Sequence, residues 1–502
     1  MDRALKRVTL AILVMFLLLL LNTNYLQAFE ANSLTTKPEN DRASAEQSQI
    51  QRGDIKTSDG VTIAASKPSG PNGTYKYQRY YSDGPVYSPV TGYDTLYGTQ
   101  TGVENSESDL LSGSGQQLAL RNFLDQITNK AQKGATVQTT INSKAQQAAY
   151  KGLASVLQGS GHSGGLVAMD PSTGKILAMA SYPSYNPNAL ASQNGVEVNK
   201  ADQALQAQNP SPLINNATSA LLPPGSTFKI VTSSAWFTEH SDQNANSEAQ
   251  SPTVLTLPQT TDKLHNDQNE QCGDGSGKAT LIYAFAQSCD TTFGNLGMQI
   301  GGTNLQSEAE KFGMNKPMDV PGLSAATSSY SVPNSPPLTA FSAIGQFSDT
   351  ATPLQEAMFA SAVANNGTLM RPYLVQQATA SDLSVVQSTP PQVLSAAVSP
   401  TVDNNLKQMM TAVMQQPEGT GYQFNKNNEG GLAIAGKTGT AQNAMNGVSS
   451  APDAVFTSYA PADSTPKIAV GVMIQGGGYG ATAAAPIAVN VEKAYLAAVG
   501  QG

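Results

Sequence analysis

The chain has 502 residues, enough for two or three domains of ~100–200 residues each. Its formal net charge is −8 at pH 7, and only 13% of its residues are charged, about half of the ~25% found in an average globular protein. A negative chain of this kind does not suggest the basic face that nucleic acid requires, so we expect no nucleic-acid partner. Solubility must instead rest on Ser, Thr, Asn and Gln.

The N-terminus has the pattern of a membrane anchor. Arg3, Lys6 and Arg7 precede a nearly unbroken apolar run over residues 8–21. The stretch 8–29 is close to the ~20 residues that a helix needs to cross a bilayer. No small-x-small cleavage site follows, which favours an uncleaved anchor over a cleaved signal peptide. Basic flanks stay in the cytoplasm, so we expect a single-pass protein of the cell membrane with the rest of the chain on the extracytoplasmic side.

A smaller domain is expected to follow the cytoplasmic tip and anchor (residues 1–29). Residues 30–135 form one compositional unit, in which residues 55–63 predict a strand, a turn at Asp59-Gly60 and a second strand. Nothing in this unit has the pattern of a catalytic site. We therefore expect a β-rich, non-catalytic scaffold domain.

Residues 136–502 predict a larger domain of the α+β or α/β class. Strands come first, helices occupy the middle and strands return at the end, so the two ends are expected to pair in one antiparallel sheet flanked by helices. The expected elements are a helix over 143–157, a hairpin over 165–179 that turns at Asp170-Pro171-Ser172-Thr173-Gly174, strands over 434–441, 455–460 and 468–474, and a last helix from about Pro486.

A candidate nucleophile lies in the middle of this domain. Pro223-Pro224-Gly225 stops any preceding helix, and Ser226 is a good residue to begin the next one. On a helix, Ser226 and Lys229 share a face. A serine hydroxyl needs a neighbour to take its proton, and a lysine can do so where its surroundings keep it neutral. Alone, Ser-x-x-Lys also fits an N-cap serine beside a surface lysine.

Two further motifs make the pattern specific. Ser288-Cys289-Asp290 follows about 60 residues later, and a predicted strand near the C-terminus carries Lys437-Thr438-Gly439-Thr440. Glycine at 439 would let a substrate lie against the strand, while the lysine and threonines offer donors to a carboxylate. Ser-x-x-Lys, Ser-x-polar and Lys-Thr-Gly in this order are typical of the serine acyltransferases that react with penicillin.

The chain resembles the class B penicillin-binding proteins, and within them the actinobacterial penicillin-binding protein A group, over nearly its whole length. Besides the three motifs, the matching segments are Gln51-Arg52-Gly53-Asp54-Ile55, Val86-Tyr87-Ser88-Pro89-Val90-Thr91-Gly92, Ser181-Tyr182-Pro183-Ser184-Tyr185-Asn186-Pro187, Ile344-Gly345-Gln346, Asn366-Gly367-Thr368-Leu369-Met370-Arg371-Pro372-Tyr373 and Ala484-Ala485-Pro486-Ile487. The resemblance implies a penicillin-binding transpeptidase fold and a peptidoglycan D,D-transpeptidase activity, with carboxypeptidase action as a side reaction.

The resemblance also implies a role for each motif residue. Ser226 would attack the penultimate D-Ala of a stem peptide that ends in D-Ala-D-Ala, or the ring of a β-lactam, with Lys229 as base. Ser288 would pass a proton to the leaving amine. Lys437 would supply positive potential, Thr438, Gly439 and Thr440 would hold the substrate, and the N–H groups of Ser226 and Thr440 would form the oxyanion hole. No metal or cofactor is implied, and the three histidines, His162, His240 and His265, show no ligand spacing.

One residue departs from the family pattern. The family has Ser-x-Asn where this chain has Asp290. An ionised aspartate only accepts hydrogen bonds, and it would hold Lys229 protonated, which makes a poor base. Three interpretations stay open: an enzyme adapted to an acidic exterior, where Asp290 is protonated and can donate; a substitution tolerated at neutral pH; and a weakened enzyme. The low content of charged residues agrees with the first. At Asp453, a second departure from the family, we expect only altered packing.

The two cysteines, Cys272 and Cys289, are a disulfide candidate because the domain is expected outside the cytoplasm. Closing a loop of about 17 residues would stabilise the fold by ~3 kcal/mol. Two buried free thiols are the alternative. A bridge would pin the loop that carries Ser288.

Two other functions share part of this pattern. A serine β-lactamase or β-lactam sensor would have the three motifs but would not need the front domain. A catalytically inert scaffold of the wall-synthesis complex would not need the retained nucleophile and lysines. The front domain is too short for a glycosyltransferase, so the resemblance implies a membrane glycosyltransferase of the SEDS family as partner.

Overall fold

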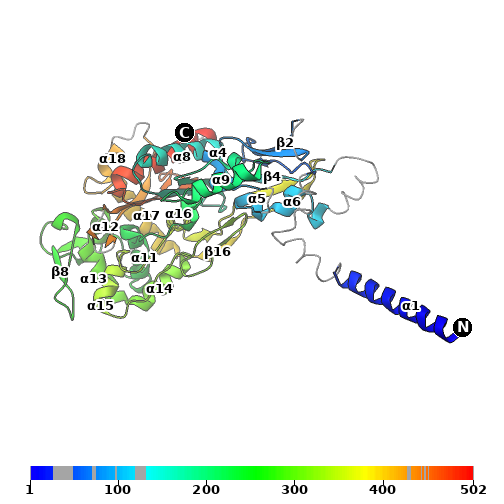
Figure 1. Cartoon of the computed structure of the whole chain (residues 1–502). Coiled ribbons are helices and arrows are strands. Elements are labelled where there is room, and N and C mark those ends of the chain that lie inside the picture. The colour runs from blue at the N-terminus through cyan, green and yellow to red at the C-terminus, as the bar shows by residue number, and fades with distance from the viewer. Residues whose placement is uncertain are drawn as a thin grey trace.

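The structure is a computed structural model of the whole chain (Figure 1), and it describes residues 2–26, 49–70, 75–95, 99–118, 132–426, 431–442, 444–445, 448–449 and 451–500. Helix α1 (Asp2–Tyr25) extends away from the folded body. Within it, the 20 residues Lys6–Tyr25 have a mean hydropathy of 2.0, so this helix is long and apolar enough to span a bilayer.

A five-stranded antiparallel sheet forms the centre of the larger domain. Its strand order is β17 (Ala435–Ala441), β20 (Asp453–Ala460), β21 (Ile468–Ile474), β5 (Gly164–Met169) and β6 (Ile176–Tyr182). The hairpin β5–β6 joins the C-terminal strands because β21 pairs with β5. The expectation that the two ends of this domain share one antiparallel sheet is therefore confirmed, and β17 lies at the edge of that sheet.

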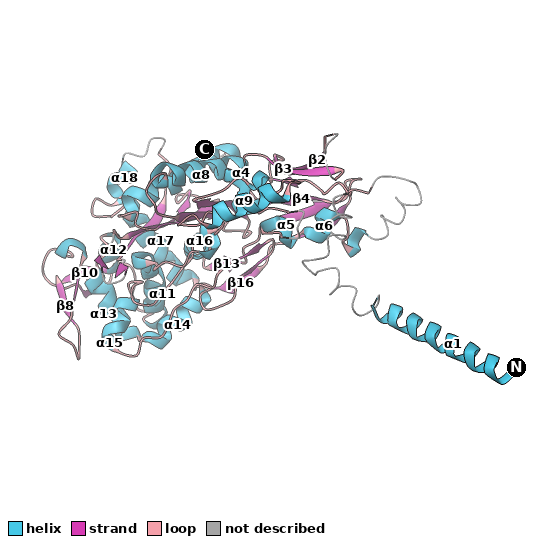
Figure 2. Ribbon diagram, in the orientation of Figure 1, coloured by secondary structure: helices cyan, strands magenta, loops and turns pink. Residues whose placement is uncertain are grey.

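Helices cover both faces of the central sheet (Figure 2). The hydroxyl of Thr457 donates to the backbone oxygen of Glu356 in α16 (Pro353–Ala364), while the hydroxyl of Ser458 donates to Glu492 in α19 (Ala485–Ala498). Successive side chains of a strand point to opposite faces, so α16 and α19 lie on opposite sides of β20. Helix α8 (Ser143–Leu157) packs against α19 and β6.

A second sheet combines strands from the front and rear of the chain. Its order is β15 (Val385–Ser388), β14 (Val375–Thr379), β4 (Thr136–Thr139), β1 (Ile55–Lys56), β2 (Thr62–Pro68) and β3 (Tyr77–Tyr81). The expected strand–turn–strand over 55–63 is present, since β1 pairs antiparallel with β2. The expected domain bounds, 1–29, 30–135 and 136–502, stay a prediction. Strands from both sides of the expected boundary share this sheet, since β1 pairs with β4.

The front domain also contains helices that its sequence did not reveal: α4 (Gly84–Thr91), α5 (Gly102–Ser106) and α6 (Ser108–Ser112). The carboxylate of Glu104 in α5 is fully buried and accepts from Arg52 Nε and Arg79 Nε, each at 2.6 Å. Burial alone would raise the pKa of Glu104, but the two guanidinium groups outweigh it and lower that pKa. This ion-pair cluster ties α5 to β3 and to the start of the domain.

The remaining elements complete the molecule around the two sheets. They are η2 (Gln116–Leu118), η3 (Pro187–Ala189), α9 (Gly195–Gln206), α10 (Asn216–Ser219), η4 (Gly225–Phe228), α11 (Lys229–Glu239), β7 (Glu248–Gln250), β8 (Val254–Thr256), β9 (Lys263–His265), η5 (Asp267–Asn269), β10 (Lys278–Thr280), α12 (Leu281–Ala286), α13 (Asp290–Ile300), α14 (Gly302–Lys311), β11 (Asp319–Val320), β12 (Leu323–Ser324), α15 (Pro336–Ser342), β13 (Thr368–Met370), β16 (Val393–Ala396), α17 (Pro400–Gln415), α18 (Tyr422–Lys426), β18 (Ala444–Met445), β19 (Val448–Ser449) and η6 (Gly480–Ala484).

Buried carboxyl groups make the stability of this fold depend on pH. Glu492 is fully buried, Oε1 accepts from Ser458 at 2.7 Å and Oε2 has no hydrogen-bond partner. Burial raises the pKa of Glu492 from 4.5 to about 8. The neutral form therefore contributes stability that is fully present below pH ~4.5 and is lost as pH rises through ~8.

We expect Glu492→Gln to flatten the pH dependence of unfolding. In the parent protein, this one group lowers the free energy of unfolding by about 1.4 kcal/mol per pH unit between pH ~5 and ~8. Glutamine keeps the shape of the side chain but does not titrate. Thermal unfolding of the full chain in detergent from pH 5 to 8 would measure the difference. Equal slopes for the parent and the variant would contradict the assignment.

Candidate active site

The Ser-x-x-Lys motif lies where a 3-10 turn passes into a helix. The turn η4 holds Ser226, and Lys229 is the first residue of α11. The sequence predicted an α-helix from Ser226 onward, whereas the first turn is wound more tightly. In a 3-10 turn, side chains at i and i+3 eclipse one another, so Ser226 and Lys229 still project from the same side. Ser226 is partly exposed and Lys229 is fully buried.

Three glycines let the turn that carries Ser226 pack closely against its neighbours. A Cβ on Gly439 would lie 2.9 Å from Pro224 O, and one on Gly345 would lie 2.1 Å from Gly225 O. Gly225 has φ +57°, and its N–H donates to Gly345 O at 2.9 Å. Glycine at 439 is thus required because β17 touches the turn that carries Ser226. The sequence alone suggested a different reason for this glycine, the approach of substrate to the strand.

All three motifs meet at the hydroxyl group of Ser288. Lys229 Nζ donates to Ser288 O at 2.7 Å, to Ser288 Oγ at 3.1 Å and to Asp290 Oδ1 at 2.6 Å. Lys437 Nζ donates to the same Ser288 Oγ at 2.8 Å and to Thr438 O at 3.0 Å. When both lysines are ammonium groups, Ser288 Oγ accepts from both, and its own proton is available to a third group. A neutral Lys229 has only two N–H groups and gives up one of its three contacts.

Burial controls the charge of both lysines. Their ammonium groups lie 5.5 Å from the ring centres of Phe293 and Phe285. Burial lowers the pKa of Lys229, and this effect exceeds the opposing attraction of Asp290. Burial, with the nearby charge of Lys229, also lowers the pKa of Lys437 well below 10.5. Asp290 does raise the pKa of Lys229, as the sequence analysis expected, but the net shift is downward.

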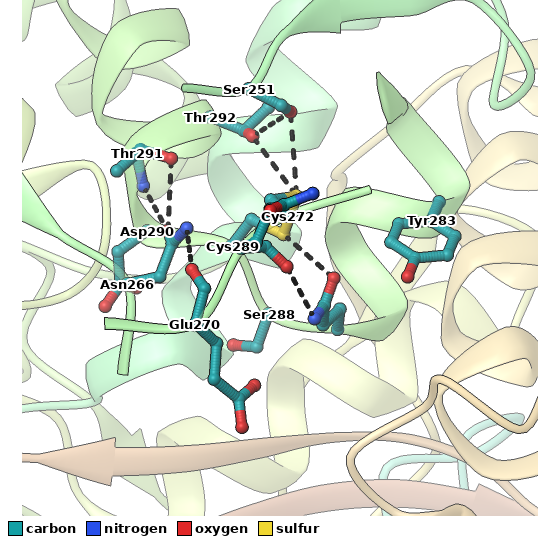
Figure 3. The surroundings of a disulfide bond; sticks show 12 residues. Ser251, Asn266, Glu270, Cys272, Tyr283, Ser288, Cys289, Asp290, Thr291 and Thr292 are labelled. Atoms are coloured by element: carbon teal, nitrogen blue, oxygen red, sulfur yellow. Dashed lines mark hydrogen bonds between the residues drawn. A yellow bond between two sulfur atoms is a disulfide. The ribbon is translucent and has the colours of Figure 1, made fainter. Parts of the chain in front are cut away.

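A disulfide fastens the loop that carries Ser288 (Figure 3). Cys272 and Cys289 are joined, and both are almost fully buried. Ser288 itself has φ +65°, a conformation that non-glycine residues rarely adopt. Asn266 Oδ1 accepts from the N–H of Thr291 at 3.0 Å, which satisfies a donor at the start of α13. The segment 266–272 therefore holds the Ser288 loop from one side, covalently and by hydrogen bonds.

The Lys-Thr-Gly strand presents its hydroxyl groups beside this loop. The hydroxyls of Thr438 and Thr420 are 2.5 Å apart, and Thr440 is partly exposed. A Cβ on Gly225 would lie 3.2 Å from Thr440 O, so β17 passes directly beside Ser226. Because β17 is an edge strand, its outer side can pair with an extended peptide.

The structure thus brings all three motifs together. Hydrogen bonds connect Lys229, Ser288, Asp290 and Lys437, and the backbone of Gly225 and Gly439 places Ser226 against β17. No hydrogen bond joins Ser226 to Lys229 in the described part of the chain. Catalytic hydrogen bonds often tighten only when substrate binds.

Sequence reasoning missed three residues that support the site. Asn266 and Thr420 gave no local signal. Glu356 did give one, because it is the single charged residue in α16, a helix whose residues are all buried. Its Oε1 lies 3.0 Å from the hydroxyl of Thr227, the neighbour of Ser226.

The histidines and acidic residues suggest no metal site. Among the residues that the structure describes, no group of three or more His, Cys, Asp or Glu could hold a metal ion. His162 and His265 are exposed, whereas His240 is half-buried and stacks on Trp236 with ring centres 3.7 Å apart. Asp453 is buried and accepts from Gly476 N at 2.8 Å, so it secures the turn after β21.

Comparison with known proteins agrees with this geometry. Residues 164–493 match the penicillin binding protein transpeptidase domain, and residues 52–137 match the penicillin binding protein A dimerisation domain. This chain belongs to the penicillin-binding protein transpeptidase family. The fold expected from the sequence is therefore confirmed.

Individual relatives of this family are similar over almost their full length. Peptidoglycan D,D-transpeptidase PbpA of Mycolicibacterium smegmatis is 37% identical over 97% of each chain. PbpA of Mycobacterium tuberculosis is 36% identical over 99% of each chain. Among solved structures, the ceftriaxone acyl-enzyme complex of M. tuberculosis penicillin-binding protein A has a TM-score of 0.84 at 35% identity, covering 90% of this chain and 100% of that one. A penicillin G acyl-enzyme complex of the same protein has a TM-score of 0.82.

Replacing Asp290 is expected to move the pH dependence of acylation. Asp290→Asn removes the charge that raises the pKa of Lys229 but keeps an oxygen acceptor. Neutral Lys229 should then form at lower pH, so if Lys229 is the base, the acid side of the acylation profile should shift down by about one pH unit. Rates of acylation by benzylpenicillin, measured against pH, would show this. A single profile shared by parent and variant would mean that Asp290 does not control the base.

Removing the disulfide is expected to slow acylation without unfolding the protein. A loosened Ser288 loop should lower the acylation rate by roughly tenfold. The double variant Cys272→Ser/Cys289→Ser can be compared with the parent before and after reduction, with thermal unfolding as a check on folding. The variant should be slow and insensitive to reductant, and the reduced parent should match it. Full acylation by the variant would leave the bridge a purely structural role.

Proposed function

We propose that this protein is a peptidoglycan D,D-transpeptidase in which Ser226 forms the acyl-enzyme. The observation that carries this proposal is the hydroxyl of Ser288, which accepts from two buried lysines, Lys229 and Lys437, beside the Ser226 turn. This arrangement can remove a proton from a nucleophile and deliver one to a leaving group without any metal or cofactor.

Acylation begins when neutral Lys229 takes the hydroxyl proton of Ser226. The oxygen of Ser226 bonds to the carbonyl carbon of the penultimate D-Ala, or of a β-lactam ring, and the carbonyl becomes an oxyanion. Collapse of this intermediate breaks the C–N bond. Ser288 donates its proton to the nitrogen and regains one from a neighbouring lysine ammonium, so the terminal D-Ala leaves as a neutral amine and the acyl-enzyme remains.

Substrate binding relies on the strand beside the nucleophile. Lys437 supplies positive potential, and Thr438 and Thr440 hold the terminal carboxylate of the stem peptide along the open edge of β17. The N–H groups of Ser226 and Thr440 stabilise the oxyanion as its charge develops. An amine from a second stem peptide then takes the acyl group and forms the crosslink. Attack by water instead gives carboxypeptidase action as a side reaction.

The setting of this reaction follows from the anchor. We infer that α1 crosses the cell membrane once, with Arg3, Lys6 and Arg7 in the cytoplasm and the catalytic domain on the outer side. Stem peptides of nascent peptidoglycan would reach the site there. A membrane glycosyltransferase of the SEDS family would supply the glycan strands, with α1 and the front domain as its contact surfaces.

Benzylpenicillin should acylate the full chain in detergent, with one adduct per molecule. Intact-protein mass spectrometry would detect the adduct, and peptide mapping would place it on Ser226. Ser226→Ala should form none. Turnover of a thioester analogue of D-Ala-D-Ala should likewise disappear in that variant. Absence of any adduct would favour the inert scaffold, and rapid hydrolysis of penicillin would favour the β-lactamase.

A further inference from the structure

A buried carboxyl group lies directly behind the nucleophile turn. Glu356 is fully buried in α16, and its Oε1 lies 3.0 Å from Thr227 Oγ1. Thr227 is also fully buried and follows Ser226 in the turn η4. Its hydroxyl makes a second contact, with Pro224 O at 2.8 Å. Nothing in the reaction described above uses either side chain.

The two contacts of the Thr227 hydroxyl favour a protonated Glu356. A threonine hydroxyl has one proton, and the carbonyl of Pro224 can only accept. An ionised Glu356 leaves that one proton shared between two acceptors, whereas a protonated Glu356 can donate to Thr227, which then donates fully to Pro224. The other oxygen, Oε2, is buried without a partner, as a neutral carboxyl tolerates better than a carboxylate.

The surroundings of Glu356 favour this neutral form. Burial raises the pKa of Glu356 from 4.5 to about 8. The elements packed against α16 include β5, β13, β20, β21, α10 and α17. Their ionisable side chains are Asp453 and Tyr459 of β20 and Asp403 and Lys407 of α17, and Lys407 pairs with Asp403 at 2.8 Å. None of these supplies a cation to Glu356.

We propose that Glu356 is a positioning residue for Ser226: its neutral carboxyl donates to Thr227 and so fixes the turn that presents the nucleophile and its oxyanion-hole N–H. This inference rests on the function proposed above. Residues 224–227 form a short turn that is held at Pro224 by the hydroxyl of Thr227, at Gly225 by Gly345 and at Thr227 by Glu356. Ionisation of Glu356 weakens one of these links and places a negative charge behind the forming oxyanion.

Two substitutions at Glu356 separate positioning from packing. Glu356→Gln keeps a donor for Thr227 but does not titrate. Glu356→Met fills the same space without a donor. We expect the glutamine variant to acylate with benzylpenicillin within about twofold of the parent at pH 6, and the methionine variant to be about tenfold slower at unchanged thermal stability. If Glu356 were merely structural, the methionine variant would acylate as fast as the parent, and its thermal stability would change because methionine removes a buried polar group.

The pH dependence gives the second readout. The ratio of parent rate to Glu356→Gln rate should be near one at pH 6 and should fall by about tenfold by pH 9, because only the parent ionises. Taking the ratio cancels the titration of the lysines, which both proteins share. Glu492→Gln is the matched control, with an equally buried carboxyl on the opposite face of the sheet. The ratio of the parent's acylation rate to that of Glu492→Gln should stay constant from pH 6 to pH 9.

The outcomes distinguish the two proposals. A methionine variant as fast as the parent, or a constant ratio of parent to Glu356→Gln across pH, overturns the positioning role while leaving the acyl-enzyme function intact. A parent that forms no adduct at any pH overturns both. Full-length protein in detergent serves for every measurement.

Discussion

The burial of two lysine ammonium groups around one serine hydroxyl is the constraint on which the site depends. Lys229 and Lys437 are both fully buried, and each lies near a phenylalanine ring. Two like charges in such a place are costly, so at least one lysine tends to be neutral. A neutral lysine is what serine acylation needs. The sheet, the disulfide and α11 all serve to hold these side chains in that unfavourable position.

Burial also disfavours the charged form of carboxyl groups, but for them it raises the pKa instead of lowering it. Glu356 and Glu492 lie on opposite faces of the central sheet, and burial raises the pKa of each to about 8. Both are neutral where an exposed glutamate is charged. Each of these two groups therefore stabilises the folded state more at acidic than at alkaline pH, whereas the lowered pKa of Glu104 acts in the opposite direction.

The sequence predicted those features that depend on local pattern. Helix α8 and strand β21 have the bounds that periodicity indicates, and the three motifs lie together as their order implies. Long-range pairing was beyond local pattern. Neither the contact of Glu356 with Thr227, 129 residues away, nor the pairing of β14 with β4 leaves a periodic trace. The one local signal that could have revealed the contact of Glu356 with Thr227 is a lone glutamate in a helix that is otherwise apolar enough to be buried.

The charge state of Lys229 is the quantity that tests this account most directly. Lysine side chains labelled with 13C at Cε and 15N at Nζ can be titrated by NMR in the full chain, with Lys229→Arg and Lys437→Arg to assign the two buried groups. We predict that the pKa of Lys437 lies well below 10.5, that the pKa of Lys229 is also lowered, and that Asp290→Asn lowers the pKa of Lys229 further. Titration of Lys229 with the exposed lysines, near ~10.4, would contradict it.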